Sequence, residues 1–119
     1  MSQVCVISIY VPNMQEAIEF YTQVLNFEVN KQYGPKIATL VNGALPLVLE
    51  ESDKVPYKTE SHPSGVVLAL KTDDIEQALE QLKDAKVDLL VGVPTDCPPG
   101  KFISFRDPFG NVIEYLQFA

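Results

Sequence analysis

The chain carries the same pattern of strand, helix cap and apolar stripe twice, at an offset of 61 residues. This offset places Val6 on Val67 and Asn13 on Asp74. Few identities survive the alignment, but caps, stripes and strands coincide. An internal repeat of this length constrains the fold strongly, because each copy must be one supersecondary unit that buries its apolar face against a neighbour.

Both copies begin a helix with the same signals. Asn13 and Asp74 are typical N-cap residues, and each is followed three positions later by Glu16 or Gln77, as in a capping box. Apolar residues at helical spacing follow each cap: Met14, Ala17, Ile18, Tyr21 and Leu25 in the first copy, and Ile75, Ala78, Leu79 and Leu82 in the second. Asn26 is expected to end the first helix.

Short apolar runs bounded by glycine, proline and asparagine predict the strands. They lie at 4–11, 27–32, 36–41 and 45–50 in the first copy, and at 66–71, 87–93, 101–105 and 112–118 in the second. Asn42 and Gly43 form a hairpin signal, and residues 94–100 are expected to form a loop with three prolines. The order β-α-β-β-β, found twice, predicts an α+β fold.

We expect a single domain over residues 1–119, with one module at about 1–54, a polar linker at about 55–64 and a second module at about 65–119. A chain of 119 residues is long enough for one domain core. Two such modules can bury their sheet faces together and curl into an eight-stranded open cup. The cavity of such a cup is a common place for a small molecule to bind.

Charge and composition exclude several classes of partner. Nine Lys plus Arg residues against sixteen Asp plus Glu residues leave a net charge of −7, whereas nucleic-acid binding requires basic residues. No apolar run approaches the roughly 20 residues of a membrane span, and no secretory signal is visible. Cys5 and Cys97 form neither a CxxC pair nor a disulfide framework. This cysteine usage is typical of a reducing, cytoplasmic setting.

Motifs near both ends of the chain resemble those of the vicinal oxygen chelate superfamily. They are Ile-Ser-Ile-Tyr-Val-Pro-Asn-Met at 7–14, Ala-Ile-Glu-Phe-Tyr at 17–21, Val-Leu-Asn-Phe at 24–27 and Phe-Arg-Asp-Pro-Phe-Gly-Asn at 105–111. This superfamily includes glyoxalase I, extradiol dioxygenases, fosfomycin-resistance enzymes and bleomycin-resistance proteins. The resemblance implies a glyoxalase/bleomycin resistance-like fold, and Asp107 and Asn111 are expected to shape a tight turn.

The resemblance also implies a divalent metal, held by one ligand from the first and fourth strands of each module. Carried over to this sequence, the two expected histidines fall on Val6 and Val67. The fourth-strand ligand of the first module falls near Leu49, or on Glu50 if the register shifts by one. Glu114 is the retained carboxylate. Because valine cannot coordinate a cation, we expect no metal at the usual ligand set and no cofactor.

Two residues are candidates for catalysis if the chain is an enzyme. His62, the one histidine, lies in the linker, where it could act as a base over the cavity or simply be solvated. Glu114 lies between Val112 and Leu116 on one face of its strand, so it is either exposed or placed in a pocket.

Strand alternation points to candidate ligand-binding residues. It places Val6, Ser8 and Tyr10 on one face of the first strand, and the resemblance implies that this face lines the cavity. The ligand-binding candidates are therefore Ser8, Tyr10, Glu50 and Glu114. Tyr10 has an equal alternative role, covering the core with its hydroxyl group in water.

The missing histidines favour a protein with a degenerate metal site that binds a small molecule in the cup. The acidic net charge favours a cationic ligand. The alternative is a divalent-metal-dependent lyase or dioxygenase of the same superfamily with an unusual metal shell, and a third reading is a structural module whose cavity is filled by side chains. We also expect a homodimer, because the resemblance implies one and because the exposed edge strands of open sheets can be covered by a second copy.

Overall fold

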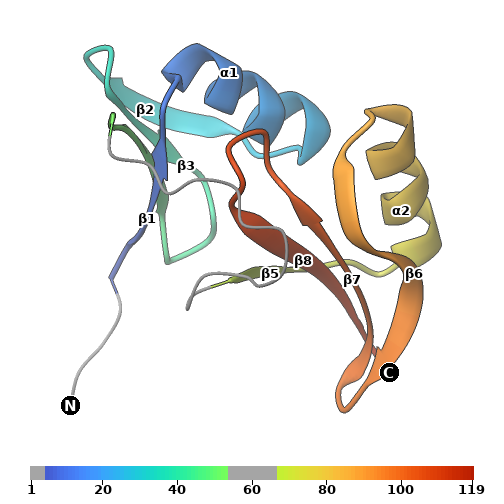
Figure 1. Ribbon diagram of the computed structural model, residues 1–119. Helices are drawn as coiled ribbons and strands as arrows, with labels where there is room; N and C mark the ends of the chain where they lie inside the picture. The colour runs from blue at the N-terminus through green and yellow to red at the C-terminus, as the bar shows by residue number, and fades with distance from the viewer. Residues whose placement is uncertain (1–4, 54–66) are drawn as a thin grey trace. The chain divides into compact units, whose positions relative to one another are not determined.

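The computed structural model describes residues 5–53 and 67–119 (Figure 1). The chain divides into two compact units, Met1–Pro56 (unit 1) and Tyr57–Ala119 (unit 2). The predicted linker, and the predicted strand starts at 4 and 66, lie outside the described residues. Within the described part, no helix is long and apolar enough to cross a membrane.

Both units have the predicted order of elements. Unit 1 contains β1 (Ile7–Val11), α1 (Met14–Glu19) with a π-helical turn (Phe20–Val24), β2 (Val29–Tyr33), β3 (Ile37–Leu40) and β4 (Leu47–Glu51). Unit 2 contains β5 (Leu68–Lys71), α2 (Ile75–Asp84), β6 (Asp88–Cys97), β7 (Gly100–Arg106) and β8 (Val112–Phe118). The sheet orders are β1-β4-β3-β2 and β5-β8-β7-β6. The α+β fold of two β-α-β-β-β modules is confirmed.

Each sheet combines one parallel pair with two antiparallel pairs. The first strand of each unit runs parallel to the last, as β1 does to β4 and β5 does to β8, and the remaining neighbours are antiparallel. A parallel pair needs a long crossover, which the helix and the two intervening strands supply. The helix consequently lies on one face of its own sheet and leaves the other face without a helix (Figure 1).

The predicted N-caps are confirmed in both units. The side chain of Asn13 accepts a hydrogen bond from the backbone N–H of Glu16 at 3.0 Å, and Asp74 accepts one from that of Gln77 at 3.1 Å. Each bond satisfies an N–H group that has no partner within the helix. The first helical segment runs from Met14 to Val24, as α1 followed directly by the π-helical turn, and Asn26, with a positive φ of 64°, ends it as the sequence predicts.

A second tie joins the start of each helix to the last strand of the same unit. The Oε2 atom of Glu51 accepts the Met14 N–H at 3.0 Å, and the Oε1 atom of Gln117 accepts the Ile75 N–H at 2.8 Å. The two units therefore repeat this contact although one uses a carboxylate and the other an amide. The offset of 61 residues hides it, because the strands and turns after the helix differ in length between the units.

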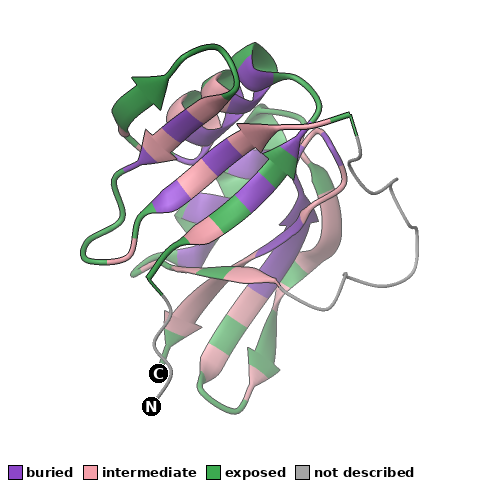
Figure 2. Cartoon of the chain, turned by 90° about the vertical axis from the view of Figure 1, so that its left-hand side faces the viewer, coloured by how far each residue is buried: buried purple, intermediate pink, exposed green. Residues whose placement is uncertain are grey.

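In unit 1, alternation along the strands places the core between the sheet and its helix (Figure 2). In β1, Ile9 and Val11 are buried, whereas Ser8 and Tyr10 are exposed. In unit 2, β7 is buried at every position from Ile103 to Arg106, so both faces of that sheet carry buried side chains. The larger core side chains, all less than a tenth exposed, include Met14, Phe20, Tyr21, Leu40, Leu47 and Leu49 in unit 1, and Ile75, Leu79, Leu82, Ile103, Phe105 and Ile113 in unit 2. The predicted helical stripes supply a large part of both sets.

The predicted loop at 94–100 is wrong. Strand β6 continues through Pro94 to Cys97, and its register with β7 shifts between Val91 and Thr95. Strand β6 lies at the edge of its sheet, where the missing N–H of a proline disrupts no ladder on the open side. The three prolines therefore mark an irregular edge strand and a short turn rather than one long loop.

Tyr115 provides a test of core burial in unit 2. Its ring stacks on that of Phe105, with 5.6 Å between the centroids, and burial raises the pKa of Tyr115 above its ordinary value of 10.0. Because the folded chain holds this proton more tightly than the unfolded chain, stability is lost as the pH rises above about 10. We expect the Tm to fall less steeply for Tyr115→Phe than for the unchanged protein between about pH 9.5 and 11. Equal slopes in a thermal unfolding series would contradict this assignment.

Candidate functional site

The helix-free face of unit 1 carries two tyrosines and a carboxylate in one line across the sheet. Tyr10 of β1 pairs with Glu50 of β4, Glu50 pairs with Ile37 of β3, and Ile37 pairs with Tyr33 of β2. Paired residues point to the same side of a sheet, and strands lie about 4.8 Å apart, so the two tyrosines are about 14 Å apart along the line. We call these four residues the tyrosine row.

The tyrosine row is open to contact. Tyr10 is 49% exposed and Tyr33 is 52% exposed, while Glu50 and Ile37 are half-buried between them. The Nζ atom of Lys31 lies 4.7 Å from the centroid of the Tyr33 ring, a cation–π contact that limits where the ring can turn. The face therefore offers two aromatic rings on either side of a negative charge.

Strand pairing settles which β4 residue lies on this face. Leu49 is fully buried on the helix side of the sheet, so it cannot be a ligand position. Glu50 is on the helix-free side, next to Tyr10. Of the two fourth-strand positions that the sequence left open, only Glu50 can meet a ligand on the helix-free face.

Glu50 is not, however, the counterpart of Glu114 in the repeat. In β5, Ala69 pairs with Glu114, and in β1 the residue aligned with Ala69 by the repeat is Ser8, which pairs with Val48. The position equivalent to Glu114 is therefore Val48. Glu50 lies two residues further along β4, so its carboxylate belongs to the tyrosine row rather than to a repeat of the Glu114 site.

The helix-free face of unit 2 places Glu114 beside a serine. Glu114 is half-buried and lies between Ala69 of β5 and Ser104 of β7, which is 6% exposed. On the same face of β7, the Nη1 atom of Arg106 lies 3.3 Å from the Oδ2 atom of Asp88. The Arg106 side chain is only 9% exposed, so this face contains a buried cation that sequence reasoning missed.

The residues present do not fit the metal that the resemblance implies. Val6 is 40% exposed and Val67 is half-buried, and neither offers a donor atom. Among the described residues, no group of three His, Cys, Asp or Glu side chains lies close enough to hold a metal ion. His62 lies outside the described residues. Glu114 thus has no described neighbours that would complete a metal site with it.

Sequence reasoning also missed Tyr33. Strand alternation places Tyr33 on the same face of β2 as Lys31. Alternation does not show, however, which residues of the neighbouring strands lie beside it. An exposed aromatic residue just before the Gly34-Pro35 turn is an available signal, and it becomes informative only once Tyr33 is aligned with Tyr10 across two intervening strands.

The chain is similar in sequence to two curated proteins and in fold to a solved structure. The metallothiol transferase FosB of Staphylococcus epidermidis is 29% identical over 105 residues, which are 87% of this chain and 73% of that protein. The uncharacterized protein YetH of Bacillus subtilis is 26% identical over 117 residues, covering 94% of this chain and 95% of YetH. The crystal structure of TnmS3, an antibiotic-binding protein from Streptomyces sp. CB03234, matches with a TM-score of 0.79 and 26% identity, covering 100% of this chain and 98% of TnmS3.

A family model also matches the chain, and the matched residues include the motifs at 7–27 and 105–111. The model of the Glyoxalase/Bleomycin resistance protein/Dioxygenase superfamily covers residues 3–115, and the chain belongs to this superfamily.

Proposed function

We propose that this protein binds a small molecule without a metal and that the tyrosine row makes the principal contacts. The observation that carries the proposal is the alignment of exposed Tyr10 and Tyr33 with Glu50 on a face that no helix of the unit covers. Exposed aromatic side chains provide large, rigid contact surfaces for a planar ligand. The likeness to TnmS3, an antibiotic-binding protein, supports the same class of function.

The charge of this face favours a cationic aromatic ligand. Glu50 can pair with a positive group while the Tyr10 ring contacts an aromatic body or the cation itself. The Tyr33 ring already has the Lys31 ammonium group 4.7 Å from its centroid, so it contacts the aromatic body rather than the cation. The net charge of −7 adds long-range attraction for cations. Ser8, two residues before Tyr10 on β1, supplies a hydroxyl group on the same face. Glu114, beside Ser104, is a separate candidate for ligand contact within unit 2.

Replacing Tyr10 by alanine tests the proposal. We expect at least about tenfold weaker binding of a cationic glycopeptide antibiotic by Tyr10→Ala, because the main aromatic contact is removed, whereas Tyr10→Phe keeps most of the affinity. Isothermal titration calorimetry measures the affinity, and tyrosine fluorescence offers a second readout because the chain has no Trp.

Two charge variants sharpen this experiment. Glu50→Gln should weaken binding of the cationic ligand, whereas Glu51→Gln, which changes the same charge on the opposite face of the sheet, should leave it unchanged. Unchanged affinity in both Tyr10→Ala and Glu50→Gln would refute a role for the tyrosine row.

A metal-dependent lyase or dioxygenase is the second candidate. The observation that favours it is the half-buried Glu114 beside Ser104, at the one position where the superfamily's carboxylate is retained. Elemental analysis after mild purification separates the two candidates. A stoichiometric divalent ion that is lost in Glu114→Ala would support the enzyme and count against the binding protein.

The proposal also includes a homodimer, by family resemblance, and a cytoplasmic location, because both described cysteines are free.

A further inference from the structure

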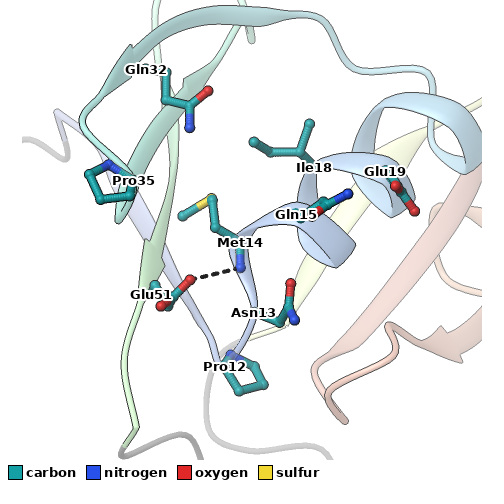
Figure 3. Close-up of a pocket in the computed structure, with 9 residues that line it drawn as sticks. All are labelled: Pro12, Asn13, Met14, Gln15, Ile18, Glu19, Gln32, Pro35 and Glu51. Carbon is teal, nitrogen blue, oxygen red and sulfur yellow. Dashed lines mark hydrogen bonds between the residues drawn. The ribbon is translucent and has the colours of Figure 1, made fainter.

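A concave surface lies at the start of α1, on the side of the unit 1 sheet opposite to the tyrosine row (Figure 3). It is open to solvent and has a volume of about 560 Å³, within the usual range of small-molecule sites. Six of its lining residues supply the apolar, amide and acidic groups that a ligand would meet: Met14, Ile18, Pro35, Gln32, Glu19 and Glu51. It is separate from the tyrosine row, because Glu51 and Glu50 are successive residues of β4 and point to opposite faces.

The lining combines an apolar floor with acidic and amide groups. Met14 is only 4% exposed, and its side chain and that of Ile18 point from α1 toward Gln32 and Pro35 (Figure 3). Two carboxylates line the cavity, and no Lys, Arg or His is among its lining residues. An apolar body with a positive group complements such a surface.

Two backbone N–H groups at the start of α1 already have side-chain acceptors. The Met14 N–H is bound by Oε2 of Glu51 at 3.0 Å, and the Glu16 N–H is bound by Oδ1 of Asn13 at 3.0 Å. The bond to Met14 orients the Glu51 carboxylate at the cavity, and the structure records no partner for its Oε1 atom among the described residues. Lys36 donates no ion pair to Glu51 in that part of the chain, although its carbonyl group accepts the Glu51 N–H.

We propose that this cavity at the start of α1 binds a small organic cation with an apolar skeleton, of the aryl-alkyl ammonium class. The ammonium group donates to Oε1 of Glu51, and the hydrocarbon part lies against Met14, Ile18 and Pro35. The Glu51 carboxylate is half-buried and already oriented by its bond to Met14, so less side-chain freedom is lost when the charge pair forms. Binding in this cavity does not depend on the ligand proposed for the tyrosine row.

The methionine content offers a direct probe. The chain has two methionines, Met1 and Met14, so labelling with methyl-¹³C methionine gives two NMR signals, one of which reports on the cavity floor. Titration with 2-phenylethylammonium should shift the Met14 signal saturably, with a Kd of about 1 mM, as expected for a ligand of this size. The uncharged analogue 2-phenylethanol should bind at least about tenfold more weakly, because it cannot form the charge pair.

Neighbouring charge variants separate this cavity from the tyrosine row. Glu51→Gln should weaken 2-phenylethylammonium binding at least about tenfold. Its amide can keep the tie to Met14, as Gln117 does for Ile75 at 2.8 Å. Glu50→Gln, the same change on the opposite face, should leave the Met14 titration unchanged.

Three results would overturn the proposal: no Met14 shift with the cation, equal shifts with cation and alcohol, or equal effects of the two variants. The comparison of cation and alcohol uses the unchanged protein, so it decides the matter even if Glu51→Gln lowers the Tm.

Discussion

Gly100→Ala is expected to destabilise the protein by at least about 3 kcal/mol, which is large for a change of one methyl group. Gly100 begins β7, where it pairs with Phe118 of β8 and Cys97 of β6. A Cβ atom at this position would collide with the carbonyl oxygen of Gln117 and would lie 2.9 Å from the backbone nitrogen of Ala119. These are backbone atoms, so relief requires separating β7 from the end of β8.

Urea unfolding followed by circular dichroism measures this effect, with Gly43→Ala as the matched control. Gly43 has a positive φ of +54°, but a Cβ atom there meets nothing within 4 Å. The control variant should therefore lose only the backbone term, about 1 kcal/mol. Similar losses in both variants would show that the close approach of β8 to Gly100 does not determine the outcome.

Asp107→Ala is expected to cost about 3 kcal/mol of unfolding free energy. Asp107 is 1% exposed and holds the turn between β7 and β8. Its Oδ1 atom accepts the backbone N–H groups of Phe109 and Asn111 at 2.9 and 2.8 Å, and its Oδ2 atom accepts the Asn111 side-chain amide at 2.7 Å. Alanine would leave these donors without their acceptor in a region where water has little access.

Asp107→Asn is the informative comparison for this turn. Asparagine keeps one carbonyl oxygen, which can still accept both backbone N–H groups, and loses the charged acceptor for the Asn111 amide. Its loss in urea unfolding should therefore be less than half that of Asp107→Ala. If Asp107→Ala unfolds at the same urea concentration as the unchanged protein, the turn does not depend on this carboxylate. The superfamily-like motif at 105–111 is therefore expected to shape this turn rather than to take part in catalysis.

Local chemistry accounts for the parts of the fold that were predicted correctly. A cap such as Asn13 or Asp74 needs only the N–H group three residues ahead, so a short stretch of sequence is sufficient to identify it. Alternation along β1 likewise places Tyr10 opposite Ile9 and Val11 without reference to any other strand. The apolar stripe of α2 predicts its buried face for the same reason.

Errors arose where a residue's role depends on its neighbours in the sheet. The strand through Pro94 was missed because tolerance for proline depends on whether the strand is at an edge, and edge position is a property of the whole sheet. Arg106 was missed because its partner, Asp88, comes from another strand. Neither relation has a local signature.

The sequence by itself determined the repeat, the helix caps, the superfamily and the loss of both expected histidines at Val6 and Val67, because each is a property of residue identity and spacing. Only the tertiary structure decided that Glu50, rather than Leu49, shares a face with Tyr10 and Tyr33, and that Glu51 lies beside a separate cavity. The physical reason is strand register. A shift of one residue moves every side chain of a strand to the other face, and register is set by pairing between distant segments.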